Sequence, residues 1–274
     1  MIELGDITVN RMGYGAMRIT GKGVWGIPED PEECKRVLKR LPEIGVNFID
    51  TANSYGPETS ELLIAEALHP YPEGMLIGTK AGLVRPGPGD WEPDGRPEHL
   101  REAVEGSLGR LRMERLDLLQ LHRPDPKVPF EESVGALVDL QQEGKIRHIG
   151  LCNVGRAQLE QAMGMSQVVS VQNRYNLADR KSEKVLQACE DKGLPFLPWF
   201  PVGAGNLTEA GGRLDQVANK HSATPAQVAL AWLLHHSPVT LVIPGTSKVA
   251  HLEENVAAAS IDLDPEDMAQ LEAD

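Results

Sequence analysis

Four side chains of complementary chemistry stand at or near the ends of short apolar runs. Asp50, Lys80 and His122 each end such a run, and Tyr55 follows Asp50 by five residues. An ammonium about 4 Å from a phenol favours the phenolate by roughly 4 kcal/mol at an effective dielectric of about 20, which is worth about three pKa units. We therefore expect Lys80 to lower the pKa of Tyr55 and make it a general acid. Asp50 would hold Lys80 charged, and His122 would position a carbonyl oxygen by hydrogen bonding.

This set of groups indicates a reaction in which an oxygen is protonated while a hydride reaches the neighbouring carbon. No side chain can supply a hydride, so the reaction requires a cofactor. A second interpretation starts from Lys80 alone, because a desolvated lysine on a barrel strand can attack a carbonyl and form a Schiff base, as in an aldolase. That interpretation leaves other polar strand-end residues without a role, namely Asn153, Gln172 and Trp199.

The elements that would position these residues alternate along the chain. Apolar and β-branched runs predict eight strands, at residues 11–15, 46–50, 75–80, 116–122, 146–153, 168–173, 195–200 and 240–244. Helical spacing of apolar residues predicts helices between and after them, at residues 31–45, 60–68, 97–111, 130–143, 158–163, 182–192, 225–235 and 249–259. A repeat of about 30 residues favours right-handed βαβ units in one parallel sheet.

Eight such units predict an α/β protein with a (β/α)₈ TIM barrel, spanning residues 1–274 as one domain. The alternative is a doubly wound sheet, which normally has a glycine-rich turn after its first strand, and no GxGxxG motif follows residues 11–15 here. The first ten residues alternate around Gly5 and Asp6, which predicts a β-hairpin that closes the barrel bottom.

In such a barrel the C-terminal ends of the strands surround one mouth. Polar or aromatic residues end the second to the seventh predicted strand: Asp50, Lys80, His122, Asn153, Gln172 and Trp199. Two loops rich in Gly or Pro, at residues 85–96 and 203–212, follow strands at the same face, where substrates bind.

Motifs along essentially the whole chain resemble those of the aldo-keto reductases. They are NFIDTANSYG at 47–56, TKAG at 79–82, LLQLHRP at 118–124, IGLCN at 149–153, VQNRYN at 171–176, PWFPVGAG at 198–205 and IPGTSKVAHLEEN at 243–255. The resemblance implies a barrel that binds NADP(H) in an extended form. It also implies a catalytic tetrad whose matches here are Asp50, Tyr55, Lys80 and His122, with the tyrosine as proton donor.

By the same resemblance, Asn153 and Gln172 would hydrogen-bond the nicotinamide carboxamide, and Trp199 would stack on the nicotinamide ring. Further cofactor contacts are expected from residues of several loops, and backbone groups at helix N-termini and turns suit phosphate. These residues are Gly15, Met17, Cys152, Phe200, Pro201, Val202, Gly203, Gly205, Asn206, Gly245, Thr246, Ser247, Lys248, His251, Glu254 and Asn255.

The chain departs from the family pattern at the expected site for the 2′-phosphate of NADP(H). Many members have a lysine after the proline and an arginine six residues later, where this chain has Gly245 and His251, so NAD(H) is not excluded. Ser247 and Lys248 would compensate. The PWFPVG, IPGTSKVAHLEEN and GYGAM segments look most like a bacterial branch that includes pyridoxal reductases, which reduce the vitamin B6 aldehyde to pyridoxine.

Substrate choice in these barrels lies in loops, and the candidates here are Met17, Trp25 and Trp91. The broader expectation is a small or aromatic aldehyde as substrate. The same family also supplies channel-associated proteins that bind NADPH and turn over slowly. A redox-sensing subunit with little turnover is therefore a further hypothesis.

Charge and cysteine content bound the partners. With 27 basic and 40 acidic side chains the net charge is -13, which disfavours nucleic acid or an anionic membrane as a partner. Three widely spaced cysteines, Cys34, Cys152 and Cys189, suggest neither disulfides nor a metal site. The N-terminus has no signal-peptide pattern and no run spans a bilayer, so we expect a cytoplasmic protein, either a monomer or a weak oligomer.

Overall fold

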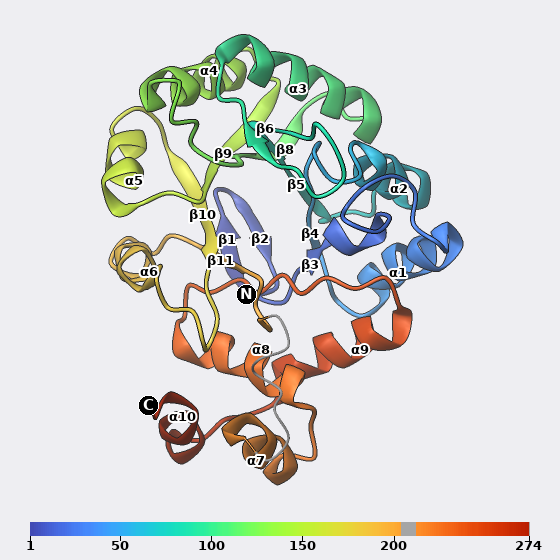
Figure 1. Cartoon of the computed structure of the whole chain (residues 1–274), viewed down its shortest axis with the longest axis vertical. Coiled ribbons are helices and arrows are strands. Elements are labelled where there is room, and N and C mark those ends of the chain that lie inside the picture. The colour runs from blue at the N-terminus through green and yellow to red at the C-terminus, as the bar shows by residue number, and fades with distance from the viewer. Residues whose placement is uncertain (204–211, 274) are drawn as a thin grey trace.

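The computed structural model describes residues 1–203 and 212–273 and has a parallel sheet that curls into a barrel inside a ring of helices (Figure 1). The sheet has seven strands in the order β11-β10-β9-β8-β5-β4-β3. Their bounds are β3 Tyr14–Gly15, β4 Phe48–Asp50, β5 Leu76–Ala81, β8 Leu116–Leu121, β9 Ile146–Cys152, β10 Val168–Arg174 and β11 Phe196–Trp199. All of the pairs within this sheet are parallel, as the βαβ repeat predicts.

The predicted eighth strand is not a strand in the structure. Residues 240–244 instead make isolated parallel bridges, Met12 with Val242 and Phe196 with Thr240. Main-chain hydrogen bonds run from Gly13 N to Val242 O at 2.8 Å and from Leu241 N to Phe196 O at 2.9 Å, so this segment still closes the ring between β3 and β11. The barrel prediction is therefore confirmed, with its last position filled by extended chain.

Helices cover the outside of the barrel. They are α1 Pro31–Glu43, α2 Thr59–Leu68, α3 Pro97–Leu111, α4 Phe130–Gln142, α5 Arg156–Met163, α6 Glu183–Glu190, α7 Arg213–Lys220, α8 Pro225–His236, α9 Val249–Ala257 and α10 Pro265–Glu272, with 3-10 turns η1 Ala16–Ile19 and η2 Ala258–Ser260. Local signals set several of their starts: Asp30 accepts a bond from Glu33 N ahead of Pro31, and Thr224 forms a capping box ahead of Pro225.

Two helices, α7 and α10, were not among the predicted elements. Asp264 caps α10 by accepting from Glu266 N and Asp267 N, just before Pro265, which is a start signal readable from the sequence. In α7 the buried residues Leu214 and Val217 have helical spacing. Both helices lie together at one end of the molecule (Figure 1).

Two short antiparallel pairs of strands lie outside the seven-stranded sheet. The N-terminal hairpin of β1 Ile2–Leu4 and β2 Ile7–Val9 confirms the predicted one. Leu4 and Val9 are fully buried in a cluster with barrel residues such as Phe48 and Leu118, so the hairpin plugs the barrel bottom. A second pair, β6 Leu83–Val84 with β7 Glu92–Pro93, lies inside the loop expected at residues 85–96 and the residues just before it.

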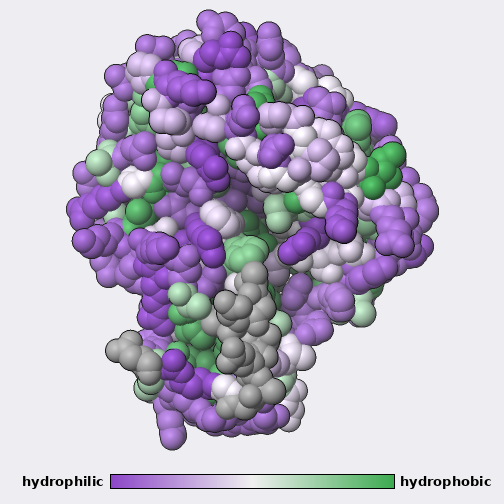
Figure 2. All heavy atoms as spheres, in the orientation of Figure 1, coloured by the Kyte–Doolittle hydropathy of each residue, from purple (hydrophilic) through white to green (hydrophobic). Residues whose placement is uncertain are grey.

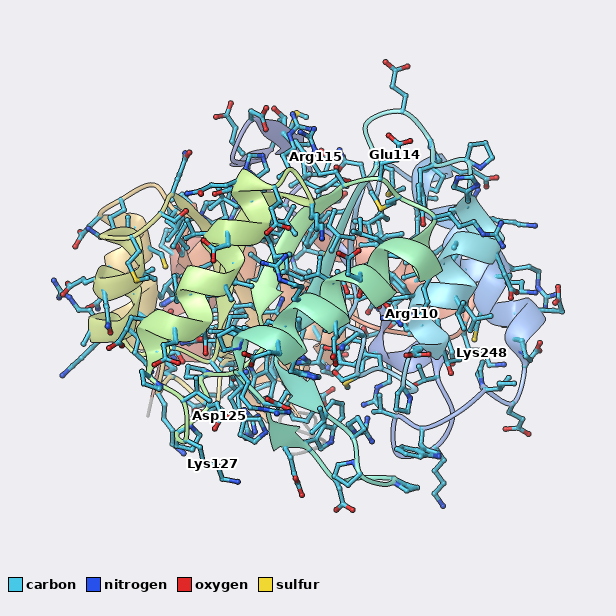
Figure 3. All side chains as sticks on the ribbon, turned by 90° about the horizontal axis from the view of Figure 1, so that it is seen from above. Arg110, Glu114, Arg115, Asp125, Lys127 and Lys248 are labelled. Carbon is cyan, nitrogen blue, oxygen red and sulfur yellow. The ribbon has the colours of Figure 1, made fainter. Side chains whose placement is uncertain are left out.

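Figure 3 shows the barrel from the side. Glu114 and Arg115, just before β8, lie at the upper edge, and Asp125 and Lys127, which follow β8, lie at the opposite edge. The edge with Asp125 is therefore the C-terminal face of the strands, which faces the viewer in Figure 1.

Candidate active site

Asp50, Tyr55 and Lys80 meet at the C-terminal ends of β4 and β5. The Lys80 ammonium donates to Asp50 Oδ2 at 2.7 Å, to Thr51 O at 2.9 Å and to the Tyr55 hydroxyl at 3.3 Å. Lys80 is fully buried, and Asp50 is 3% exposed. The predicted proximity of acid, ammonium and phenol is present in the structure.

The pKa of Tyr55 differs from the sequence-based expectation. Burial raises it and the charge of Lys80 lowers it, but burial outweighs Lys80 and the pKa rises from its ordinary value of 10 to about 12. The expectation that Lys80 makes Tyr55 more acidic than a free phenol is therefore wrong for the net shift, although the direction of the lysine's effect is right. Burial alone would lower the pKa of Lys80, but the Asp50 carboxylate raises it above its usual value, so the lysine stays charged.

His122, which follows β8, lies beside the phenol. Its ring is 5.9 Å from that of Tyr55 in an edge-to-face arrangement, and its Nδ1 is 3.4 Å from the Ser54 hydroxyl. Burial lowers the pKa of His122 well below 6.5, with further lowering by the charges of Lys80 and Arg123. The imidazole is therefore neutral at neutral pH and suited to a hydrogen bond with an uncharged oxygen.

Two glutamines support the Asp50 carboxylate. Gln120 donates to Asp50 Oδ1 at 3.0 Å and Gln172 donates to the same oxygen at 2.8 Å. The resemblance implies that Gln172 binds a nicotinamide carboxamide, and in the structure its amide donates to the Asp50 carboxylate. Gln120 was not predicted. Its signal was its place two residues before His122 in the predicted strand 116–122, because alternate residues of a strand lie on the same face.

Asn153 connects His122 to Trp199. Its amide donates to His122 O at 3.0 Å, and its carbonyl oxygen accepts from the Trp199 indole at 3.0 Å. The backbone of Asn153 has a φ of 60°, a left-handed conformation that asparagine tolerates better than most residues. This turn directs the side chain across the strand ends.

These groups surround a cavity of about 530 Å³ on the C-terminal face, a size typical of small-molecule sites. Figure 2 shows a hollow near the middle of this face. The predicted residues that line the cavity are Gly15, Met17, Asp50, Tyr55, Trp91, His122, Cys152, Asn153, Gln172, Trp199, Phe200, Pro201, Val202, Gly203, Gly245 and Asn255. Lining residues that were not predicted are Arg18, Val24, Leu83, Arg123, Ile243 and Pro244.

Several predicted residues do not line the cavity. Trp25, expected to contact substrate, is half-buried, forms a bridge with Gly56 and does not line the cavity. Its prediction rested on loop position alone, and in the structure the Arg85 guanidinium lies 5.6 Å from the centre of its ring. The cavity lining also lacks Lys80, Thr246, Ser247, Lys248, His251 and Glu254, while Gly205 and Asn206 lie outside the described residues.

The chain before α9 offers hydrogen-bond donors for an anion. Gly245 lines the cavity, and the backbone N–H groups of Gly245, Thr246 and Ser247 donate to no acceptor within residues 1–203 and 212–273. Lys248 follows them directly, at the N-terminus of α9. Such a set fits the phosphates of a dinucleotide.

Comparison with known proteins agrees with this geometry. The aldo/keto reductase family matches residues 11–273. The chain belongs to the aldo/keto reductase family. It is 42% identical to pyridoxine 4-dehydrogenase of Escherichia coli, with 98% of this chain and 96% of that protein covered. It is 52% identical to an uncharacterized oxidoreductase of Schizosaccharomyces pombe, over 99% of this chain and 88% of the relative.

A solved aldo/keto reductase of Klebsiella pneumoniae, crystallised in complex with NADP and acetate, has a similar fold. It superposes with a TM-score of 0.81 at 27% identity, covering 96% of this chain and 90% of that one. Membership of the aldo/keto reductase family makes this chain an oxidoreductase with a barrel fold, as the sequence motifs implied.

Two absences apply to the described part of the chain. None of its helices is both long and apolar enough to cross a bilayer. No group of three or more His, Cys, Asp or Glu side chains there is arranged to hold a metal ion.

Proposed function

We propose that the protein reduces aldehydes or ketones to alcohols with NADP(H), and that Tyr55 donates the proton. The observation that carries this proposal is the Tyr55 hydroxyl, which lies 3.3 Å from the buried ammonium of Lys80 in a residue that lines the cavity of about 530 Å³. The Klebsiella relative with bound NADP supports the choice of cofactor. A reduced nicotinamide supplies a hydride to the carbonyl carbon when it is bound.

The chain's own residues do the rest. Neutral His122 positions the carbonyl oxygen beside the phenol, and Tyr55 gives that oxygen its proton. With a pKa of about 12 the phenol keeps its proton at neutral pH, yet it is more acidic than the alcohol that forms. Lys80, held by Asp50, then stabilises the phenolate left behind.

We assign the nicotinamide side of the cavity to Asn153, Gln172 and Trp199, and the phosphates to the backbone of residues 245–247. Ser247 and Lys248 would meet the 2′-phosphate, which favours NADP(H) over NAD(H). Gln172 donates to Asp50 in the structure, and on this assignment it also contacts the carboxamide of the bound cofactor. The same side chain would then link the cofactor to the catalytic carboxylate.

Pyridoxal is the substrate that we propose, with pyridoxine as the product. The support is the 42% identity to the Escherichia coli pyridoxine 4-dehydrogenase over nearly the whole of both chains. The cavity of about 530 Å³ has room for a single substituted ring beside a nicotinamide.

The Schiff-base alternative gains no support from the geometry. Lys80 donates to three acceptors and its pKa is raised, so it is not the uncharged amine that attack on a carbonyl requires.

One experiment tests cofactor and chemistry together. NADPH and NADH are titrated by fluorescence, and turnover is then measured with pyridoxal and benzaldehyde for the wild type and Tyr55→Phe. We expect tighter binding of NADPH, turnover by the wild type, and loss of turnover in Tyr55→Phe with NADPH binding retained. Unchanged activity in Tyr55→Phe would refute the proton donor. Tight NADPH binding without wild-type turnover on any aldehyde would indicate a sensor instead.

A further inference from the structure

Arg85 and Trp91 face each other across the neck of the β6/β7 hairpin. In this hairpin Val84 pairs with Glu92, so Arg85 is the first residue of the connecting loop and Trp91 is the last. The hairpin follows the strand that carries Lys80, and Gly82, with a φ of +106°, makes the turn between them. The Arg85 guanidinium lies 3.7 Å from the centre of the Trp91 ring, which is a close cation–π contact.

The guanidinium of Arg85 is held by main-chain carbonyls and not by a carboxylate. Arg85 is 9% exposed, and within the described residues its side-chain hydrogen-bond partners are carbonyl oxygens. Its donors reach three separate segments: Asp90 O at 2.7 Å in its own loop, Gly23 O at 3.0 Å and Val24 O at 2.8 Å after η1, and Ser54 O at 3.2 Å before Tyr55. One side chain thus joins three loops of the C-terminal face.

These bonds secure the backbone on both sides of Tyr55. Ser54, which precedes it, is bound directly by Arg85. Gly56, which follows it, pairs with the Val24 segment: Gly56 N donates to Val24 O at 3.3 Å and Gly26 N donates to Gly56 O at 2.5 Å. Arg85 binds that segment as well, so the position of the phenol depends on the same clamp.

Trp91 forms a wall of the cavity next to the reacting groups. Its ring stands edge-to-face with Tyr55 at 6.3 Å and with His122 at 6.4 Å, and it lines the cavity together with Leu83 and Val24. A rigid aromatic surface with apolar neighbours suits a flat ring, because aromatic pairs gain from both area and geometry.

We propose that Arg85 is a positioning residue that fixes Trp91 and the Tyr55 loop, and that the resulting wall selects planar aromatic carbonyl substrates over small aliphatic ones. The inference rests on the proposed carbonyl reduction and names its substrate class. A lysine cannot replace this arginine, because it lacks both the planar face that stacks on Trp91 and the fork of donors that reaches three loops.

The test compares kcat/KM for benzaldehyde with kcat/KM for propanal, with NADPH as reductant. The variants are Arg85→Met, Arg85→Lys, Trp91→Leu and the double variant Arg85→Met/Trp91→Leu. Arg96→Met is the matched control, since Arg96 is an exposed arginine of the same loop region paired with Asp94. Urea unfolding of each variant verifies that it folds. If Arg85→Met does not fold, Arg85→Lys replaces it in the double variant.

We expect the benzaldehyde to propanal ratio to fall at least tenfold in each single variant at Arg85 or Trp91 and to stay within twofold in Arg96→Met. In the double variant this ratio should fall no further than in Trp91→Leu alone, because Arg85 affects the ratio through Trp91. A benzaldehyde to propanal ratio that is unchanged in the Arg85 variants, or that falls further in the double variant than in Trp91→Leu, would overturn this inference and leave carbonyl reduction intact. A wild type that reduces neither aldehyde would instead overturn the proposed function, and this inference with it.

Discussion

Lys80 lies two residues beyond Gly78, the register partner of Asp50, so both side chains enter the barrel from neighbouring strands and meet at 2.7 Å. The pair is out of water, and Gln120 and Gln172 complete the hydrogen bonds of the carboxylate. A buried ion pair of this kind stays stable because each charge has its partners. The parallel register is therefore the basis of the catalytic arrangement.

Breaking this pair on one side should destabilise the fold. Asp50→Asn leaves the Lys80 ammonium buried without its counter-charge, and we expect a loss of about 3–5 kcal/mol in the free energy of unfolding. The double variant Asp50→Asn/Lys80→Met should lose less than the sum of the single variants, because it leaves no uncompensated charge. Urea unfolding measures all three. Additive losses would mean that the two charges are not coupled.

The pH dependence of reduction should be flat on the alkaline side. The proton donor is the protonated phenol of Tyr55, whose pKa is raised to about 12, so the donor is lost only as the pH rises through that value. We expect kcat for reduction to hold from neutral pH to about pH 10. Steady-state rates at saturating NADPH measure it. A fall in kcat centred at about pH 8 would mean that the proton donor has a much lower pKa than buried Tyr55.

Buried His122 should make the fold less stable in mild acid. Its pKa is well below 6.5 in the folded state, so below about pH 6.5 the unfolded chain takes up a proton that the folded chain does not. Stability is therefore lost as the pH falls through this range, by up to about 1.4 kcal/mol per pH unit. Urea unfolding at about pH 7 and pH 5.5 measures the free energy of unfolding, and its decrease between the two should be smaller for His122→Asn than for the wild type. Replacement of exposed His251 by Asn should leave the wild-type decrease in place.

Glu61 of α2 should support the strand that carries Lys80. Its fully buried carboxylate accepts from Thr79 Oγ1 at 2.5 Å and from Arg110 Nε at 2.7 Å (Arg110 is labelled in Figure 3). Glu61→Gln replaces two charge-assisted bonds and should cost about 1.5–3 kcal/mol in unfolding free energy. The control is Glu58→Gln, because Glu58 is exposed and pairs with the same arginine, and it should cost less than about 1 kcal/mol. Equal losses in the two variants would contradict a special role for the buried carboxylate.

Much of the arrangement followed from the sequence because its signals are local. Helix α3 has the predicted limits, Pro97–Leu111, since proline starts it and the apolar spacing is regular. Asp50, Lys80 and His122 end apolar runs, and parallel strands bring such ends to one face. The eighth strand was not predictable in detail, since whether residues 240–244 form a ladder or isolated bridges depends on how β3 and β11 meet around the ring.

The sequence by itself determined which residues meet: strand order and side-chain alternation place the acid, the ammonium, the phenol and the imidazole at one mouth, and the motifs identify the family. The tertiary structure decided their electrostatic state and their neighbours. Burial of Tyr55 outweighs the charge of Lys80, Trp25 does not line the cavity, and Arg85 finds its partners in three loops. Desolvation and loop packing depend on residues that are far apart in the sequence, so a local sequence pattern cannot predict them.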